Sequence, residues 1–150
     1  MTARVAAGPE RSAVGFDFGL RRIGVAAGDT LTGSAAPLAA VAHSARGPDW
    51  PAIDRLLAAY KPGVLVVGFP YNDDRSRGAL ADAADAFARA LAQRCGLPVE
   101  RVDEHGSSRE AAAELKQRRA AGTRRRRVQK EDVDSLAAAI ILERWLRGEH

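Results

Sequence analysis

The sequence predicts an α/β fold with a mixed five-stranded sheet, three antiparallel strands followed by parallel strands, and helices on both faces. Two observations lead to this fold class. In the first third of the chain, short apolar runs are separated by breaks rich in glycine and small residues, as in antiparallel hairpins. Beyond residue 49, helical patterns alternate with short unbroken apolar runs, which is typical of parallel strands connected by helices. No internal repeat or linker divides the 150 residues, so we expect a single domain over 1–150.

The antiparallel part of the sheet is expected near the start of the chain. Two apolar runs around a break that contains Gly19 predict strands over 13–18 and 22–28, joined by a tight turn. A weaker apolar run predicts a third strand over 38–42. Residues 1–11 lack any periodicity and are expected to form a loose, flexible leader.

Helix caps and apolar runs predict the remaining elements. Asp49 before Trp50 and Pro51 has the pattern of a helix N-cap with proline in the first turn. The unbroken run VLVVG after that helix predicts a buried parallel strand. The expected elements, in chain order, are a helix over 50–60, a strand over 64–68, a helix from about residue 80 to Gly96, a strand over 98–102, a helix over 107–121, an arginine-rich loop over 123–130 and a helix over 132–147.

Asp17 is unusual because it is a carboxylate in a strand that is predicted to be buried on both faces. Phe16 and Phe18 flank it, and an ionised carboxylate in apolar surroundings costs free energy unless a cation or hydrogen bonds compensate it. The side chain could cap the turn at the end of the strand, or it could be a metal ligand at the edge of the sheet. The residues alone leave both alternatives open.

Two further carboxylates hold comparable positions: Glu104 follows the last predicted strand, and Asp134 lies in the first turn of the last predicted helix. The carboxyl ends of neighbouring parallel strands open on one edge of a sheet, where the helix could add its own acid. Three carboxylates repel one another unless divalent cations bind between them, and an all-oxygen site suits Mg²⁺ or Mn²⁺. Two such ions about 3.5–4 Å apart can activate a water and stabilise the leaving oxygen of a phosphodiester, which is nuclease chemistry.

Structural explanations for the same acids remain open at this point. Asp134 would gain from the helix dipole whether or not it binds a metal. Asp103 and Glu104 are adjacent in a strand and point to opposite faces, so only one of them can face the site.

Positive charge is concentrated in one segment. Residues 101–130 contain 10 Lys or Arg against 4 Asp or Glu, in a chain whose formal net charge is +4. Such a patch is typical of a protein that binds a polyanion, although charge runs are more often solvated surface. The chain has no row of aromatic residues for base stacking, so we expect recognition of backbone and shape. The candidate contacts to nucleic-acid phosphates are Arg21, Arg22, Arg124, Arg125, Arg126 and Arg127.

Composition also excludes some classes of protein. Cys95 is the single cysteine, so the chain can form neither an intrachain disulfide nor a cysteine-based zinc site. No apolar stretch is long enough to span a membrane, and the N-terminus lacks the apolar core of a signal peptide. We therefore expect a soluble, cytoplasmic protein that does not associate with membranes.

The stretch VGFDFGLRRIGVAAGD resembles the opening motif of the YqgF/RuvX family, a branch of the RNase H-like superfamily described as Holliday junction resolvases or pre-16S rRNA nucleases. VLVVGFPYNDD resembles the family's central strand and loop, VDEH its acidic strand end, and VQKEDVDSLAAAIILERWL its C-terminal helix. The resemblance covers about residues 12–147 and implies an RNase H-like fold. It also implies that Asp17, Glu104 and Asp134 are the catalytic, metal-binding acids, and that Lys130 belongs to the polar lead-in to the last helix.

The sequence departs from the family pattern after the last predicted strand. His105, Gly106 and Ser107 stand where the family usually has Arg-Leu-Thr, which puts the role of the family's arginine in doubt here. His105 could act in proton transfer near the site or could simply replace that arginine. We place His105 and Asp103 beside the metal ligands rather than among them.

The resemblance implies a Mg²⁺- or Mn²⁺-dependent endonuclease selective for structured nucleic acid, first of all one that matures the 5′ end of pre-16S rRNA. The alternative is a Holliday junction resolvase acting on branched DNA, whose paired incisions favour a symmetric homodimer. A non-cleaving nucleic-acid or ribosome-binding module is a third possibility, suggested by the departures at residues 105–107. The likeness of DFGLRRIGV to the phosphate-binding hairpin of actin-like ATPases is a weaker alternative, because those enzymes need two lobes.

Overall fold

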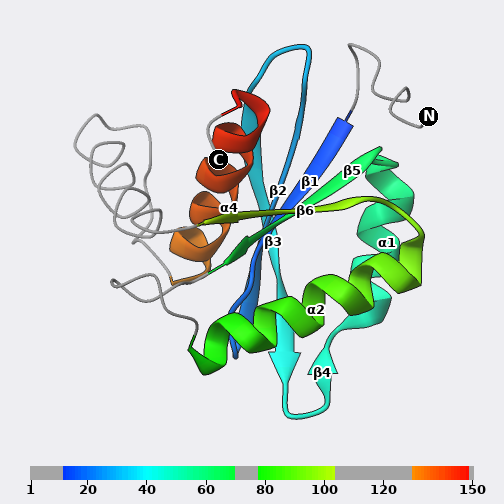
Figure 1. The fold of residues 1–150 in the computed structure, drawn as a ribbon, viewed down its shortest axis with the longest axis vertical. Coiled ribbons are helices and arrows are strands. Elements are labelled where there is room, and N and C mark those ends of the chain that lie inside the picture. Colours follow the sequence, from blue (N-terminus) through cyan, green and yellow to red (C-terminus); the bar gives the residue numbers. More distant parts are fainter. Residues whose placement is uncertain (1–11, 70–77, 104–129, 149–150) are drawn as a thin grey trace.

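The computed structural model describes residues 12–69, 78–103 and 130–148, and over 130–134 it describes the backbone alone (Figure 1). The leader expected over 1–11 and the helix expected over 107–121 lie outside these residues. So do the four arginines at 124–127. Lys130, which was expected at the end of a loop, begins the last helix.

The sheet is mixed, as the sequence predicts, and has the strand order β4-β3-β2-β1-β5-β6. The pairs β1–β2, β2–β3 and β3–β4 are antiparallel, whereas β1–β5 and β5–β6 are parallel. The first strand therefore lies beside a later parallel strand, β5. The bounds are β1 Ser12–Asp17, β2 Arg22–Asp29, β3 Ala35–Ser44, β4 Gly47–Pro48, β5 Val64–Phe69 and β6 Val99–Asp103.

Within the described residues the sheet has six strands, one more than the five expected. The additional strand β4 has two residues and pairs with His43 and Ser44 at the end of β3. It carries no apolar run, so periodicity could not reveal it. β3 is also longer than the strand expected over 38–42, because its small residues at 35–37 pair with β2 although they give little hydrophobic signal.

Helices cover both faces of the sheet (Figure 1). α1 (Trp50–Tyr60) and α2 (Ala79–Cys95) pack on one face, and α4 (Lys130–Leu146) packs on the other. The predicted caps are confirmed: the Asp49 side chain accepts a hydrogen bond from the backbone N–H of Ala52, and Gly96 ends α2 in the left-handed conformation. Among the described residues, no helix is long and apolar enough to cross a membrane.

The two faces of the sheet differ in how they are packed. On the α1 and α2 face, the ring of Phe87 contacts the rings of Phe16 and Phe18, with centroids 5.6 and 5.3 Å away. On the α4 face the core is rich in alanine, and residues 136–139, 141 and 142 of α4 are buried. Small residues allow this helix to lie close to the sheet. The consecutive buried residues 135–139 show that the helix is covered on more than one side.

Candidate active site

Asp17 is the last residue of β1 and is 8% exposed. Its neighbours in β1 show which face it occupies: Val14 and Phe16 belong to the core under α1 and α2, whereas Ala13 belongs to the core under α4. Successive residues of a strand alternate between faces, so Asp17 shares the α4 face with Ala13 and Gly15. The structure thus contains the buried strand-end carboxylate that the sequence predicts.

The carboxyl ends of the three parallel strands lie side by side. Asp17 is in register with Gly68 of β5, and Gly68 is in register with Val102 of β6. Val102 belongs to the core under α4, so this level of the sheet presents its side chains to the α4 face at both β1 and β6. Asp17 therefore lies at the carboxyl ends of the parallel strands, where open α/β sheets conventionally bind ligands. We call this end of the sheet the Asp17 edge.

Asp103 lies on the opposite face of the sheet from Asp17. It is in register with Phe69, whose side chain belongs to the core under α1 and α2. Arg101, which has the same parity in β6, contacts Asp85 of α2 and confirms that these residues face α2. Glu104 is the next residue along the chain and lies outside the described residues.

The end of β6 is held by an ion pair to α2. Arg101 donates to the Asp85 carboxylate at 2.9 Å, and Arg89 contacts the same carboxylate. Burial raises the pKa of Asp85, but the hydrogen bonds and charges of the two arginines outweigh it, so the pKa lies below its ordinary value of 3.8. The guanidinium of Arg101 also lies over the Phe69 ring, 5.4 Å from its centroid.

α4 runs antiparallel to β1, so that its N-terminal end lies at the Asp17 edge. Near the start of the helix, the buried Ser135 hydroxyl accepts a hydrogen bond from the backbone N–H of Val25 at 3.4 Å. Eight residues later, Glu143 Oε2 accepts one from the backbone N–H of Ala35 at 3.0 Å. Val25 pairs with Phe16 near the end of β1, and Ala35 reaches the start of β1 through its partner Gly28.

This direction brings the backbone of Asp134, one residue before Ser135, to the same edge as Asp17. The side chain of Asp134 lies outside the description, as does Glu104. Within the described residues, no group of three acids, histidines or cysteines gathers into a metal site. Of the three predicted acids, Asp17 is the one whose side chain the structure describes.

The turn between β1 and β2 is tightly built and carries the first two predicted phosphate contacts. A Cβ on Gly19 would stand 2.5 Å from the carbonyl oxygen of Arg22, so this position requires glycine. The Gly19 carbonyl accepts a hydrogen bond from Nδ1 of His43 at 2.7 Å, and the Arg21 carbonyl accepts one from the His43 backbone N–H at 3.0 Å. Arg21 is exposed and Arg22 half-buried beside the Asp17 edge.

Sequence reasoning missed His43 and Ser135. His43 stands at the end of a weak apolar strand, where a polar residue carries no particular signal. Ser135 interrupts the buried face of an apolar helix next to Asp134, and that interruption is a signal that could have singled it out.

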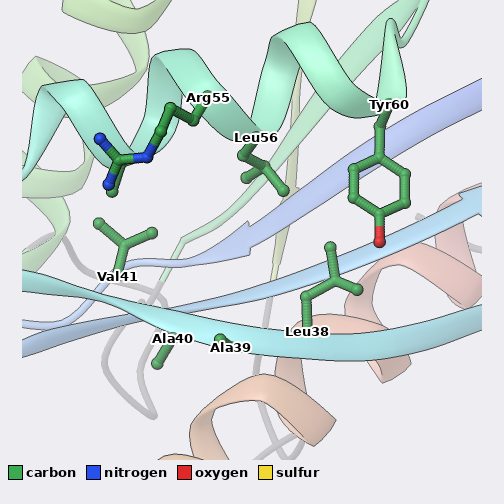
Figure 2. A pocket seen from close by; sticks show the side chains of 8 residues that line it. Leu38, Ala39, Ala40, Val41, Arg55, Leu56 and Tyr60 are labelled. Carbon is green, nitrogen blue, oxygen red and sulfur yellow. The ribbon is translucent and has the colours of Figure 1, made fainter.

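A groove of about 410 Å³ lies elsewhere, between β3 and α1 (Figure 2). Figure 2 shows Leu38 and Val41 of β3 facing Leu56 and Tyr60 of α1. Of the described residues that line it, Arg55 alone is charged. Because the groove belongs to the α1 side and contains no carboxylate, it is separate from the Asp17 edge.

Comparisons with known proteins agree with this architecture. Residues 11–148 match the sequence profile of a family described as RuvX, Holliday junction resolvase. A relative from Xanthomonas oryzae pv. oryzae (strain PXO99A), named as a candidate pre-16S rRNA nuclease, is 46% identical over 138 residues, which are 92% of this chain and 88% of the relative. A relative from Xanthomonas campestris pv. campestris (strain 8004) with the same name is 45% identical over 138 residues, again 92% of this chain and 88% of the relative.

Two solved structures share the fold. The Thermus thermophilus RuvC structure in complex with a Holliday junction substrate has a TM-score of 0.51 and 19% sequence identity, covering 92% of this chain and 94% of that one. The yeast mitochondrial Holliday junction resolvase Ydc2 has a TM-score of 0.54 and 12% identity, covering 97% of this chain and 83% of that one. At these identities the likeness concerns the fold alone.

Proposed function

This chain belongs to the RuvX family and has an RNase H-like fold, and from that premise we propose that it is a metal-dependent endonuclease that cleaves phosphodiester bonds in structured nucleic acid. One observation carries the proposal: a buried carboxylate, Asp17, stands at the carboxyl edge of the parallel strands, where the N-terminal end of α4 also lies. The match to the family spans residues 11–148, so it includes every element that forms this edge.

The proposed metal ligands are Asp17, Glu104 and Asp134. Asp103 lies on the face away from Asp17, which supports Glu104 as the ligand of the pair. The proposed donor set consists of carboxylates alone. Such a set fits a hard ion, Mg²⁺ or Mn²⁺. When bound, two such ions would supply an activated water and charge stabilisation of the leaving oxygen.

The chain's own residues position the substrate in this proposal. Arg21 and Arg22 on the turn beside Asp17 would bind backbone phosphates on one side of the scissile bond, and the basic residues before α4 would bind those on the other. The residues assigned to the second side are Arg124, Arg125, Arg126, Arg127 and Lys130. His105 would lie next to the ligands without binding the metal. Asp103, which was expected there as well from the sequence, faces α2 instead, away from Asp17.

The proposed substrate is pre-16S rRNA, because relatives that match 92% of this chain are named as candidate pre-16S rRNA nucleases. Cleavage at its 5′ end is what the family resemblance implies. This assignment would place the protein in the cytoplasm. Resolution of a four-way DNA junction is the second candidate, favoured by the description of the family. That reaction would need two active sites across the junction and therefore a symmetric homodimer. A module that binds such nucleic acids or the ribosome without cutting is the third.

Cleavage of a pre-16S rRNA fragment and of a four-way DNA junction by the same purified protein tests the proposal. We expect Mg²⁺- or Mn²⁺-dependent cutting that Asp17→Asn abolishes while binding persists. Asp103→Asn, on the other face of the sheet, is the matched control and should retain cutting. Cleavage that survives both Asp17→Asn and chelation of metal would overturn the proposal, and the absence of cutting would leave the non-cleaving module.

A second readout does not depend on activity. Mg²⁺ that binds the folded state should raise the stability of the native protein, by about 2.7 kcal/mol at 100 times its dissociation constant. Asp17→Asn should remove this stabilisation, and Asp103→Asn should keep it. Equal stabilisation of all three proteins would show that Asp17 does not bind the ion.

A further inference from the structure

Two leucines are strongly exposed at opposite ends of β2. Leu20 is 65% exposed in the turn before the strand, and Leu31 is 69% exposed in the turn after it. Single exposed leucines are common on protein surfaces and need no functional explanation. Leu31 is such a residue and serves as the comparison for Leu20. Leu20 differs in its position, because it is three residues after Asp17 and precedes the exposed Arg21.

The turn that carries Leu20 is held on both sides of that residue. The carbonyls of Gly19 and Arg21, immediately before and after Leu20, both accept hydrogen bonds from His43, one from the ring and one from the backbone. The His43 ring packs in turn on Phe18, with centroids 5.1 Å apart. His43 therefore fixes the backbone on both sides of Leu20, and the Leu20 side chain is mostly exposed to solvent in the turn that follows Asp17.

From this arrangement we propose that Leu20 is a wedge that opens a base step beside the scissile phosphate, so that the enzyme selects nucleic acid at branch points and helix ends. The inference rests on the proposed nuclease function and adds a specificity-determining residue to it. Apolar side chains next to arginines are used in this way by proteins that unstack a base step while holding the phosphates. Arg21 would bind the adjacent phosphate.

The chemistry of leucine defines the substrate class. An aliphatic side chain forms no hydrogen bond to base edges and reads no sequence. It can occupy the space of a parted base step, and parting is least costly where stacking is already interrupted, at a branch or at the boundary between a duplex and a single strand. Leu20 should therefore discriminate interrupted helices from continuous duplexes of the same sequence.

The experiment compares Leu20→Ala with Leu31→Ala on paired substrates. The substrates are a four-way DNA junction and an RNA duplex with a 5′ single-stranded extension, each alongside a continuous duplex of the same sequence. We expect Leu20→Ala to lower the rate of cleavage of the interrupted substrates by about tenfold. The free-energy change that corresponds to this factor is a fraction of the cost of unstacking one base step. Leu31→Ala should stay within about twofold of the unaltered protein. Leu20→Met, which keeps an apolar side chain of similar length, should retain most of the activity.

A fluorescence measurement reports the wedge without cleavage. 2-Aminopurine, which brightens when it unstacks, is placed at each base step around the interruption, with Asp17→Asn protein to keep the substrate intact. Brightening at one step that Leu20→Ala abolishes and Leu31→Ala preserves would support the wedge. No brightening, or a cleavage loss shared equally by the two alanine variants or by the continuous duplexes, would overturn it. Failure of the unaltered protein to cut any substrate counts against the nuclease function, and the fluorescence still decides on the wedge.

Discussion

Gly15 of β1 lies so close to Leu142 of α4 that a Cβ at position 15 would stand 3.0 Å from the Cβ of Leu142. The carbonyl of Ala138 lies 3.4 Å from the same point. Two residues further along β1 is Asp17, on the same face of the sheet. The absence of a side chain at Gly15 therefore sets how closely the helix that carries Asp134 can approach the strand that carries Asp17.

Gly15→Ala is expected to destabilise the protein by about 1–3 kcal/mol, because the added methyl group overpacks this contact. Urea denaturation measures the change in the free energy of unfolding. Leu142→Ala makes a cavity when introduced alone, but it should relieve the clash when combined with Gly15→Ala. The double variant should therefore lose less stability than the two single variants together. Additive losses would show that Gly15 and Leu142 are not in contact.

Ser135→Ala is expected to cost about 1–3 kcal/mol, because it leaves the buried backbone N–H of Val25 without its hydroxyl acceptor. The matched control is Ser12→Ala, whose hydroxyl makes a longer, exposed contact of 3.5 Å to the carbonyl of Tyr60. That substitution should change the free energy of unfolding by less than about 0.5 kcal/mol. Equal losses in the two variants would contradict the structural role assigned to Ser135.

Arg21→Gln is expected to weaken nucleic-acid binding. The slope of the logarithm of the association constant against the logarithm of the salt concentration should become less steep by about 1, the contribution of one phosphate contact. Binding titrations between low and physiological salt, with a fixed RNA duplex, give this slope. Arg55→Gln removes the same charge from an exposed position on α1, on the far side of the sheet, and should leave the slope unchanged. An identical slope for Arg21→Gln and the unaltered protein would remove Arg21 from the proposed interface.

Asp85→Asn should lower the free energy of unfolding at neutral pH. The difference from the unaltered protein should shrink as the pH falls. The pKa of folded Asp85 lies below 3.8, so its ionised form stabilises the folded state throughout the range above 3.8. That contribution is lost as the pH falls from 3.8 through the lowered pKa. Urea denaturation between pH 7 and pH 3 should show the two proteins converging on acidification. If the free energies of unfolding of the two proteins diverge as the pH falls, the assigned direction of the Asp85 pKa shift is wrong.

The Asp54–Arg94 ion pair provides the comparison for this pH effect. The hydrogen bond and charge of Arg94 lower the pKa of Asp54 as well, although burial opposes them. Both side chains are about half exposed, at 51% and 45%, so water screens the pair. Asp54→Asn should therefore show the same sign of pH dependence with a smaller amplitude than Asp85→Asn.

The sequence was sufficient for the elements with strong periodic or capping signals. Asp49, Pro51 and Gly96 mark helix ends through chemistry that acts within one turn, and the structure confirms each of them. The short strand β4 and the first residues of β3 escaped prediction, because their pairing depends on a neighbouring strand rather than on their own pattern.

The candidate site was predictable to a smaller extent. Asp17 could be singled out because a carboxylate between two phenylalanines violates the apolar pattern of a buried strand. The choice between Asp103 and Glu104 could not be made from the sequence, since a one-residue shift in register exchanges the faces. The register of Phe69 with Asp103 now places Asp103 on the α2 face, away from Asp17. The roles of Asp17, Glu104 and Asp134 as ligands stay predictions.

The hydrogen bond from Ala35 to Glu143 has a mechanical consequence. Together with the bond from Val25 to Ser135, it fastens α4 to the sheet at two points about 12 Å apart along the helix axis. Two hydrogen bonds at separate positions along the helix oppose both sliding and rotation of α4 over the sheet. In the proposed nuclease, any adjustment of the spacing between Asp17 and Asp134 would therefore be local to the residues ahead of Ser135, with the body of the helix stationary.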